Sequence, residues 1–243
     1  LIPNRLLFRS FHLKRGYIIK KRAFNLEKEA LLASGIRGKN KIAEYVRKFD
    51  HLFQQFILKI KSNSKPVERA RALFNWLWEE KPTRYKPHGN FKLNEVIDAQ
   101  LSKDSHPVGN CLGLTLLYNC LLRKMGIKAE ALYLENAFGI GAHVLTVLQT
   151  ERSLIDIENI LPDGFDYQGH LDDPSRTRWG DRELVADIYH SVGNEFFSEG
   201  EFIKALENYE MAIHLNHRYE KARLNKAILL DRMSSERETK DGS

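Results

Sequence analysis

A cysteine, a histidine and an aspartate follow one another in the middle third of the chain: Cys111, His143 and Asp156. Cys111 follows Asn110 and opens a segment with helical periodicity. The free N–H groups and the positive dipole end of a helix N-terminus favour a thiolate, and the same groups could hold the oxyanion of a tetrahedral intermediate. A nucleophilic thiol needs a base, and the base needs an orienting group. These residue types therefore predict nucleophilic cysteine chemistry.

The other cysteine, Cys120, lies nine residues after Cys111. An α-helix turns by about 100° and rises about 1.5 Å per residue, so the two thiols face opposite sides of the helix, about 13 Å apart. A disulfide between them is excluded while this helix is intact. We therefore interpret Cys120 as a thiol of the core and Cys111 as the candidate nucleophile.

His143 and Asp156 fall on two consecutive predicted strands, joined by a loop short enough for an antiparallel hairpin. In this hairpin Asp156 pairs roughly opposite Leu145 or Val147, which makes His143 and Asp156 direct or diagonal neighbours on one face. A buried aspartate is costly unless it is paired, and His143 supplies a partner. From the spacing alone, a core histidine and an unrelated edge aspartate explain the pattern equally well.

Asn110 allows two interpretations, because its side chain could help to hold an oxyanion or could cap the helix, which is the more common use. The sequence has no HExxH, CxxC or paired-histidine spacing and no Walker pattern. We therefore predict no metal site and no cofactor.

The order of elements favours an α+β fold, in which helices come first and a small antiparallel sheet follows. Apolar residues at three- and four-residue steps predict four helices, and short apolar runs bounded by turn residues predict three strands. The predicted helices span residues 42–60, 67–80, 93–99 and 111–124, and the strands 129–134, 142–148 and 154–157.

Five regions follow from composition and periodicity. A basic leader covers residues 1–40, the core with its N-terminal helices 41–165, a linker rich in Asp, Gly, Pro and Arg 166–183, a helical unit 184–233, and a flexible tail 234–243. In the helical unit, small residues alternate with aromatic ones, and this pattern resembles one tetratricopeptide repeat; the residues are Gly193, Phe196, Phe202, Ala205, Tyr209 and Ala212. We expect this unit to pack against the core, with binding of a protein partner as the functional alternative.

The core region resembles the transglutaminase-like superfamily. The resemblance lies in residues 74–80, in Gly109-Asn110-Cys111 with its Leu-rich helix, and in the segments around His143 and Asp156. Residues 90–97 and the helical tail are similar to the SirB-type subfamily. The resemblance implies a papain-like fold with Cys111 as nucleophile, His143 as base and then acid, and Asp156 as orienting group. Many SirB-type relatives have a Pro-Ile-Ser type segment at the cysteine position and are not expected to be cysteine enzymes, whereas this chain has all three triad residue types.

The resemblance implies a cysteine hydrolase or acyltransferase that acts on a peptide or amide bond through an acyl-enzyme. Its substrate would be a peptide or protein. The alternative is a catalytically inactive interaction module, in which the helical tail and the basic leader make the contacts. An electrophilic probe should separate the two hypotheses, because only a catalytic Cys111 would react much faster than Cys120.

Charge is unevenly spread along the chain. Residues 1–65 hold 16 Lys/Arg against 4 Asp/Glu, whereas the whole chain holds 38 against 32. Such asymmetry can indicate contact with an anionic membrane, although a solvated leader is the simpler interpretation. Nothing matches a nucleic-acid-binding signature, so nucleic acid is not a predicted partner. Two cysteines and the lack of an apolar run of about 20 residues favour a cytoplasmic protein.

Overall fold

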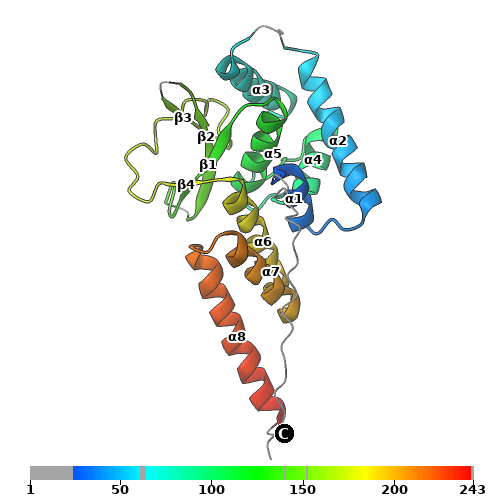
Figure 1. The fold of residues 1–243 in the computed structure, drawn as a ribbon, viewed down its shortest axis with the longest axis vertical. Coiled ribbons are helices and arrows are strands. Elements are labelled where there is room, and N and C mark those ends of the chain that lie inside the picture. Colours follow the sequence, from blue (N-terminus) through cyan, green and yellow to red (C-terminus); the bar gives the residue numbers. More distant parts are fainter. Residues whose placement is uncertain (1–23, 61–63, 140, 152, 242–243) are drawn as a thin grey trace, which may run out of the picture.

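The computed structural model describes residues 24–241 with the exception of 61–63, 140 and 152. Within these residues the chain forms eight helices and one four-stranded antiparallel sheet (Figure 1). The predicted α+β class is confirmed. None of the helices in this part of the chain is long and apolar enough to cross a membrane.

Four helices precede the element that carries Cys111. They are α1 (Leu26–Ala33), α2 (Lys39–Ile57), α3 (Pro66–Glu80) and α4 (Leu93–Leu101). Each turns an apolar stripe toward a common core, as the periodicity predicts for the last three. The assignment of residues 1–40 to a leader needs correction, because α1 lies within it. Asn25 caps α1, and Leu26, Ala30 and Leu31 are buried in the core. The rest of that leader, residues 1–23, lies outside the described residues.

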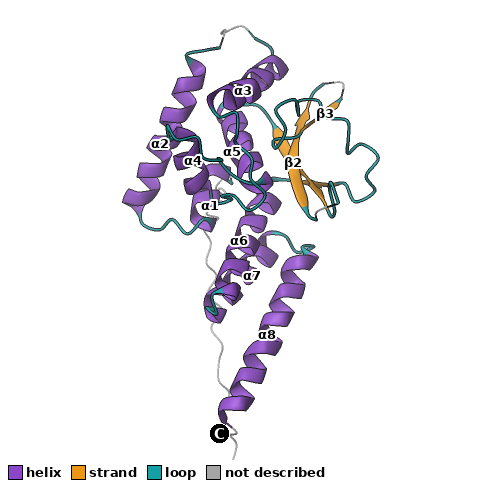
Figure 2. Ribbon diagram, turned by 180° about the vertical axis from the view of Figure 1, so that it is seen from behind, coloured by secondary structure: helices purple, strands orange, loops and turns teal. Residues whose placement is uncertain are grey.

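Helix α5 (Cys111–Lys124) runs through the centre of the molecule. Every residue from Leu112 to Leu122 is buried, because α4 packs on one side of the helix and the sheet on the other (Figure 2). A helix that is apolar all round needs such an enclosed position. Only its first residue and its last turn reach the surface.

The sheet has the strand order β3-β2-β1-β4, and all neighbours are antiparallel. Three strands lie where the sequence predicts them: β1 (Ala129–Leu134), β2 (His143–Gln149) and β3 (Leu154–Ile157). The fourth, β4 (Thr177–Trp179), falls in the predicted linker, so residues 166–183 are not only a linker. One face of the sheet packs on α5, and the segment between β3 and β4 covers the other face (Figure 2).

The C-terminal helices are α6 (Asp181–Ser198), α7 (Phe202–Leu215) and α8 (Glu220–Asp241). Helices α6 and α7 approach closely at Gly193, where an added Cβ would lie 2.6 Å from the Tyr209 ring. Helix α6 also packs against α1, and its buried residues Leu184, Val185 and Ile188 belong to the main core. The C-terminal unit therefore shares its first helix with the core, whereas α8 extends away from it (Figure 1).

Candidate active site

Cys111 is the first residue of α5, and its side chain is partly exposed. The carbonyl oxygen of the Asn110 side chain accepts a hydrogen bond from the Gly113 N–H at 3.1 Å, which confirms the capping interpretation of Asn110. Gly113 allows the chain at Asn90 to cross the first turn, because an added Cβ would lie 2.4 Å from the Asn90 carbonyl oxygen. The start of the helix is thus held from two sides, and the thiol has a fixed position.

A buried polar network ties α5 to the sheet one and two turns after the thiol. Thr115, four residues after Cys111 and on the same helical face, donates a hydrogen bond to the Val144 carbonyl at 3.0 Å. The Asn159 amide donates to the hydroxyls of Thr115 and Thr146, at 3.1 and 2.9 Å. The Thr146 hydroxyl donates to Asn119 on α5 at 2.7 Å. This network fixes the start of β2 and the chain after β3 against the thiol end of the helix.

His143, the first residue of β2, is 5% exposed. Its Nε2 lies 2.8 Å from Oε2 of Glu158. The Cys111 thiol is close enough to raise the pKa of the ring. Burial acts to lower the pKa of His143, but the interactions with Cys111 and Glu158 outweigh it and raise the pKa from 6.5 to about 9. A protonated imidazole at neutral pH stabilises a thiolate beside it.

Glu158 is fully buried one residue after β3. Burial acts to raise the pKa of its carboxyl group, but the imidazoles of His143 and His170 outweigh this effect and lower the pKa below its usual value. Glu158 is therefore an ionised carboxylate that holds the His143 ring in place. Cys111, His143 and Glu158 are therefore the candidate thiol, imidazole and carboxylate of a triad.

The prediction that Asp156 orients His143 is wrong. The strand register pairs Asp156 with Val147, and continuing this register by two residues brings Glu158 opposite Leu145, diagonal to His143. The carboxylate of Asp156 binds Arg176 instead, with both oxygens, at 2.7 and 3.1 Å. Arg176 also donates a hydrogen bond to the His170 carbonyl at 2.8 Å. Asp156 thus anchors the segment that follows Glu158.

Two groups are candidate donors for an oxyanion near the thiol. The backbone N–H of Cys111 belongs to the first helical turn, where no intrahelical acceptor exists. Tyr85 lies next to Gly109, since the two residues form a parallel β-bridge. Burial raises the pKa of the Tyr85 hydroxyl, and the negative charges of Cys111 and Glu158 raise it further, so the hydroxyl lies within electrostatic reach of both. The oxyanion role predicted for Asn110 stays a prediction, since the cap uses its carbonyl oxygen.

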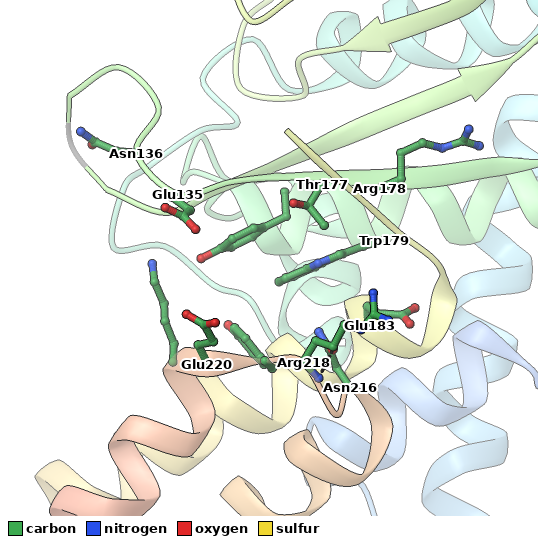
Figure 3. A pocket seen from close by; sticks show the side chains of 12 residues that line it. Glu135, Asn136, Thr177, Arg178, Trp179, Glu183, Asn216, Arg218 and Glu220 are labelled. Atoms are coloured by element: carbon green, nitrogen blue, oxygen red, sulfur yellow. Dashed lines mark hydrogen bonds between the residues drawn. The ribbon is translucent and has the colours of Figure 1, made fainter. Parts of the chain in front are cut away.

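A cavity of about 740 Å³ lies elsewhere, between the β1–β4 edge of the sheet and the start of α8 (Figure 3). Tyr133 and Trp179 stack in it with ring centroids 4.2 Å apart, and Tyr219 meets both rings edge-on. Charged side chains of both signs surround these rings: Glu135, Arg178, Glu183, Arg218, Glu220 and Lys221. It is lined by residues other than the triad. We place the chemistry at the triad, because size alone supplies no reacting group.

The spacing of residue types in the sequence does not predict Glu158 or His170 as site residues. Glu158 lies two residues after Asp156, so the side chains of both residues point to the same face of the sheet. A strand pairing shifted by two residues therefore predicts Glu158, and not Asp156, as the carboxylate next to His143. His170 stands in a segment interpreted as linker, and no local pattern marks it. The sequence predicts no metal site, but in the structure His143, Glu158 and His170 bring possible ligand atoms to within 4.8 Å of one another.

No protein-family model matches the chain, and no curated protein or solved structure gives a significant match. The geometry of the site is therefore what points to a reaction.

Proposed function

We propose that this protein is a cysteine hydrolase or acyltransferase that acts on a peptide or amide bond through Cys111, His143 and Glu158. The observation that carries the proposal is the buried imidazole of His143, whose Nε2 lies 2.8 Å from the Glu158 carboxylate and whose pKa the nearby Cys111 thiol raises. A nucleophile, a base and an orienting group in this order form the arrangement that nucleophilic acyl transfer requires.

In the first half-reaction, the thiolate sulfur of Cys111 forms a bond to the carbonyl carbon, and the π electrons move to the carbonyl oxygen. The backbone N–H of Cys111 donates a hydrogen bond to this oxyanion, with the Tyr85 hydroxyl as the candidate second donor. When the tetrahedral intermediate collapses, the C–N bond breaks and the amine takes a proton from the imidazolium of His143. The product is a thioester on Cys111 with a neutral imidazole beside it.

In the second half-reaction, His143 takes a proton from water or from an acceptor amine, and the resulting nucleophile attacks the thioester carbon. Collapse breaks the C–S bond and returns the thiolate and the imidazolium. Water gives hydrolysis and an amine gives transamidation. Because Glu158 stays ionised through both steps, it keeps the ring oriented and stabilises its positive charge.

The resemblance to the transglutaminase-like superfamily supports the same proposal, with one change. The helix-first order, the cysteine at a helix N-terminus and the histidine on a following antiparallel strand are features that a papain-like core would have. The orienting carboxylate is Glu158 in place of the implied Asp156. The tetratricopeptide-like helices α6 to α8 would then serve as the surface for a protein substrate or partner.

The test is acylation by an activated ester, because it requires no knowledge of the natural substrate. With p-nitrophenyl acetate we expect a stoichiometric burst of p-nitrophenolate, with the acetyl group located on Cys111 by peptide mass spectrometry. His143→Ala should abolish the burst, whereas the exposed-histidine control His106→Ala should keep it. Slow and equal acetylation of Cys111 and Cys120 would contradict the proposal and favour the inactive interaction module.

A further inference from the structure

A second histidine stands at the carboxylate of the triad, and the proposed reaction makes no use of it. His170 is 6% exposed, and its Nε2 lies 3.3 Å from Oε2 of Glu158, the oxygen that His143 also contacts. This nitrogen is buried, and the carboxylate oxygen that it faces is the one that already contacts His143. One carboxylate oxygen thus faces two buried imidazole nitrogens, an arrangement that calls for an explanation.

Three buried side chains therefore present ligand atoms to one point. The ring nitrogens of His143 and His170 and a carboxylate oxygen of Glu158 all lie within 4.8 Å of one another. We propose that His143, Glu158 and His170 form a binding site for a divalent transition-metal ion of the zinc type. Two imidazoles and one carboxylate are a ligand set that Zn²⁺ takes in proteins, with a water molecule in the fourth position.

The surroundings hold this site in shape. Arg176 donates a hydrogen bond to the His170 carbonyl and binds Asp156 with its guanidinium group, so the backbone at His170 is anchored to β3. The Phe138 ring lies edge-on to both imidazoles, with ring centroids 5.5 Å from His143 and 4.8 Å from His170. The two rings are thus fixed by packing, as a site that binds a metal strongly requires.

His143 offers Nε2 to the site. The ligand atoms that meet there belong to His143, Glu158 and His170, and the Cys111 sulfur is not among them. Cys111 is therefore not a ligand of this site. This placement separates the proposal from the general affinity of cysteine thiolates for zinc.

A bound ion would withdraw the Glu158 carboxylate from its orienting role, because the same carboxylate oxygen faces Nε2 of His143 and Nε2 of His170. This consequence for the triad rests on the proposed function, but the metal site does not.

The test is calorimetric titration of the full chain with ZnCl₂, followed by Co²⁺ absorption spectroscopy. We expect binding of one ion that His170→Ala weakens at least about 100-fold, as loss of one of three protein ligands should. Cys111→Ala should bind with unchanged affinity. The control His214→Ala/His217→Ala removes an exposed histidine pair in the last turn of α7 and the loop after it, which could bind zinc adventitiously, and it should also leave the affinity unchanged.

The outcomes decide between the alternatives. Co²⁺ at the proposed site should give visible d–d bands without the near-ultraviolet band of a thiolate-to-cobalt transition. A strong near-ultraviolet band that Cys111→Ala removes would overturn the proposal and assign the metal to the thiol. Binding that only the His214/His217 double variant removes would also overturn it. If zinc binds as expected but no ester burst is found in the metal-free protein, the metal site stands and the proposed enzyme activity fails.

Discussion

Helix α5 carries two thiols, and their surroundings differ in one respect that decides their chemistry. Cys111, at the N-terminus, is partly exposed and lies close enough to the His143 imidazole to raise its pKa. Cys120, nine residues later, is 3% exposed, and no histidine is among the groups that act on the pKa of its thiol. Burial raises the pKa of the Cys120 thiol well above its usual value, and the nearby carboxylates of Glu27 and Asp181 raise it further. Cys120 is therefore held as a neutral thiol.

A buried or half-buried carboxylate acts on each of the two sites, Glu158 on His143 beside Cys111 and Glu27 on Cys120, so a carboxylate alone does not make a nucleophile. At Cys111 the charge of Glu158 acts through His143, since it helps to raise the pKa of the imidazole to about 9. At Cys120 the charge of Glu27 acts on the thiol directly and opposes its ionisation. The order thiol, imidazole, carboxylate is what separates the candidate nucleophile from the structural cysteine.

The largest expected difference is in the alkylation rates of the two thiols. With iodoacetamide at neutral pH, Cys111 should react at least about 100-fold faster than Cys120, because only the thiolate attacks. Peptide mass spectrometry of time points measures both rates in one sample. Cys120→Ala should keep the fast phase and lose about 1 kcal/mol of stability from the small cavity it leaves. A fast phase that survives Cys111→Ala would reverse the comparison.

The next difference concerns the carboxylate that supports His143. Glu158→Ala should slow alkylation of Cys111 about 100-fold, and Glu158→Gln about 10-fold, because an amide still orients the ring but adds no charge. The rate at Cys120 should not change. Asp156→Asn is the matched control: it breaks the ion pair with Arg176, so it should lower the thermal midpoint while Cys111 stays reactive. Equal loss of reactivity in Asp156→Asn would return the orienting role to Asp156.

These variants also mark the limit of what the sequence could predict. Periodicity located α3, α4, α5 and three strands within a few residues, and it separated Cys111 from Cys120 correctly, because each of these features is local. The strand β4 was missed because it has only three residues and stands among turn-forming ones.

The partner of His143 was missed for a different reason. The sequence allows Asp156 to pair with either Leu145 or Val147. The first pairing places Asp156 diagonal to His143, whereas the second, which the structure has, places Glu158 there. The register is held by contacts distant in the chain, among them the bonds of Asn159 to Thr115 and Thr146. His170 reaches the site only because Arg176 anchors its segment to Asp156. Local patterns hold no information on these contacts.

A smaller effect is expected at the oxyanion position. Tyr85→Phe should lower the acylation rate with p-nitrophenyl acetate about 10-fold, because one hydrogen-bond donor to the developing charge is lost. The alkylation rate of Cys111 should change little, since alkylation forms no oxyanion. Tyr133→Phe, in the aromatic cavity of Figure 3, is the control and should leave both rates unchanged. A larger effect of Tyr133→Phe would move the reaction toward that cavity.

The smallest effect tests the Cys120 end of the helix through stability. Burial raises the pKa of Glu27 from 4.5 to about 7; the charge of Lys124 opposes this rise and that of Asp50 adds to it. One oxygen of the Glu27 carboxylate is also buried without a hydrogen-bond partner among the described residues. Because the folded-state pKa is raised, the stability that Glu27 contributes is present below pH 4.5 and is lost as pH rises through about 7. Glu27→Gln removes this titration, so the variant should gain about 2 kcal/mol over the parent at pH 8, after allowance for partial exposure, and little at pH 4. Urea unfolding at both pH values measures the difference, and the alkylation rate of Cys111 should be the same in variant and parent. A stability difference that is independent of pH would mean that the pKa of Glu27 is not raised in the folded protein, and that Cys120 is kept neutral by burial alone.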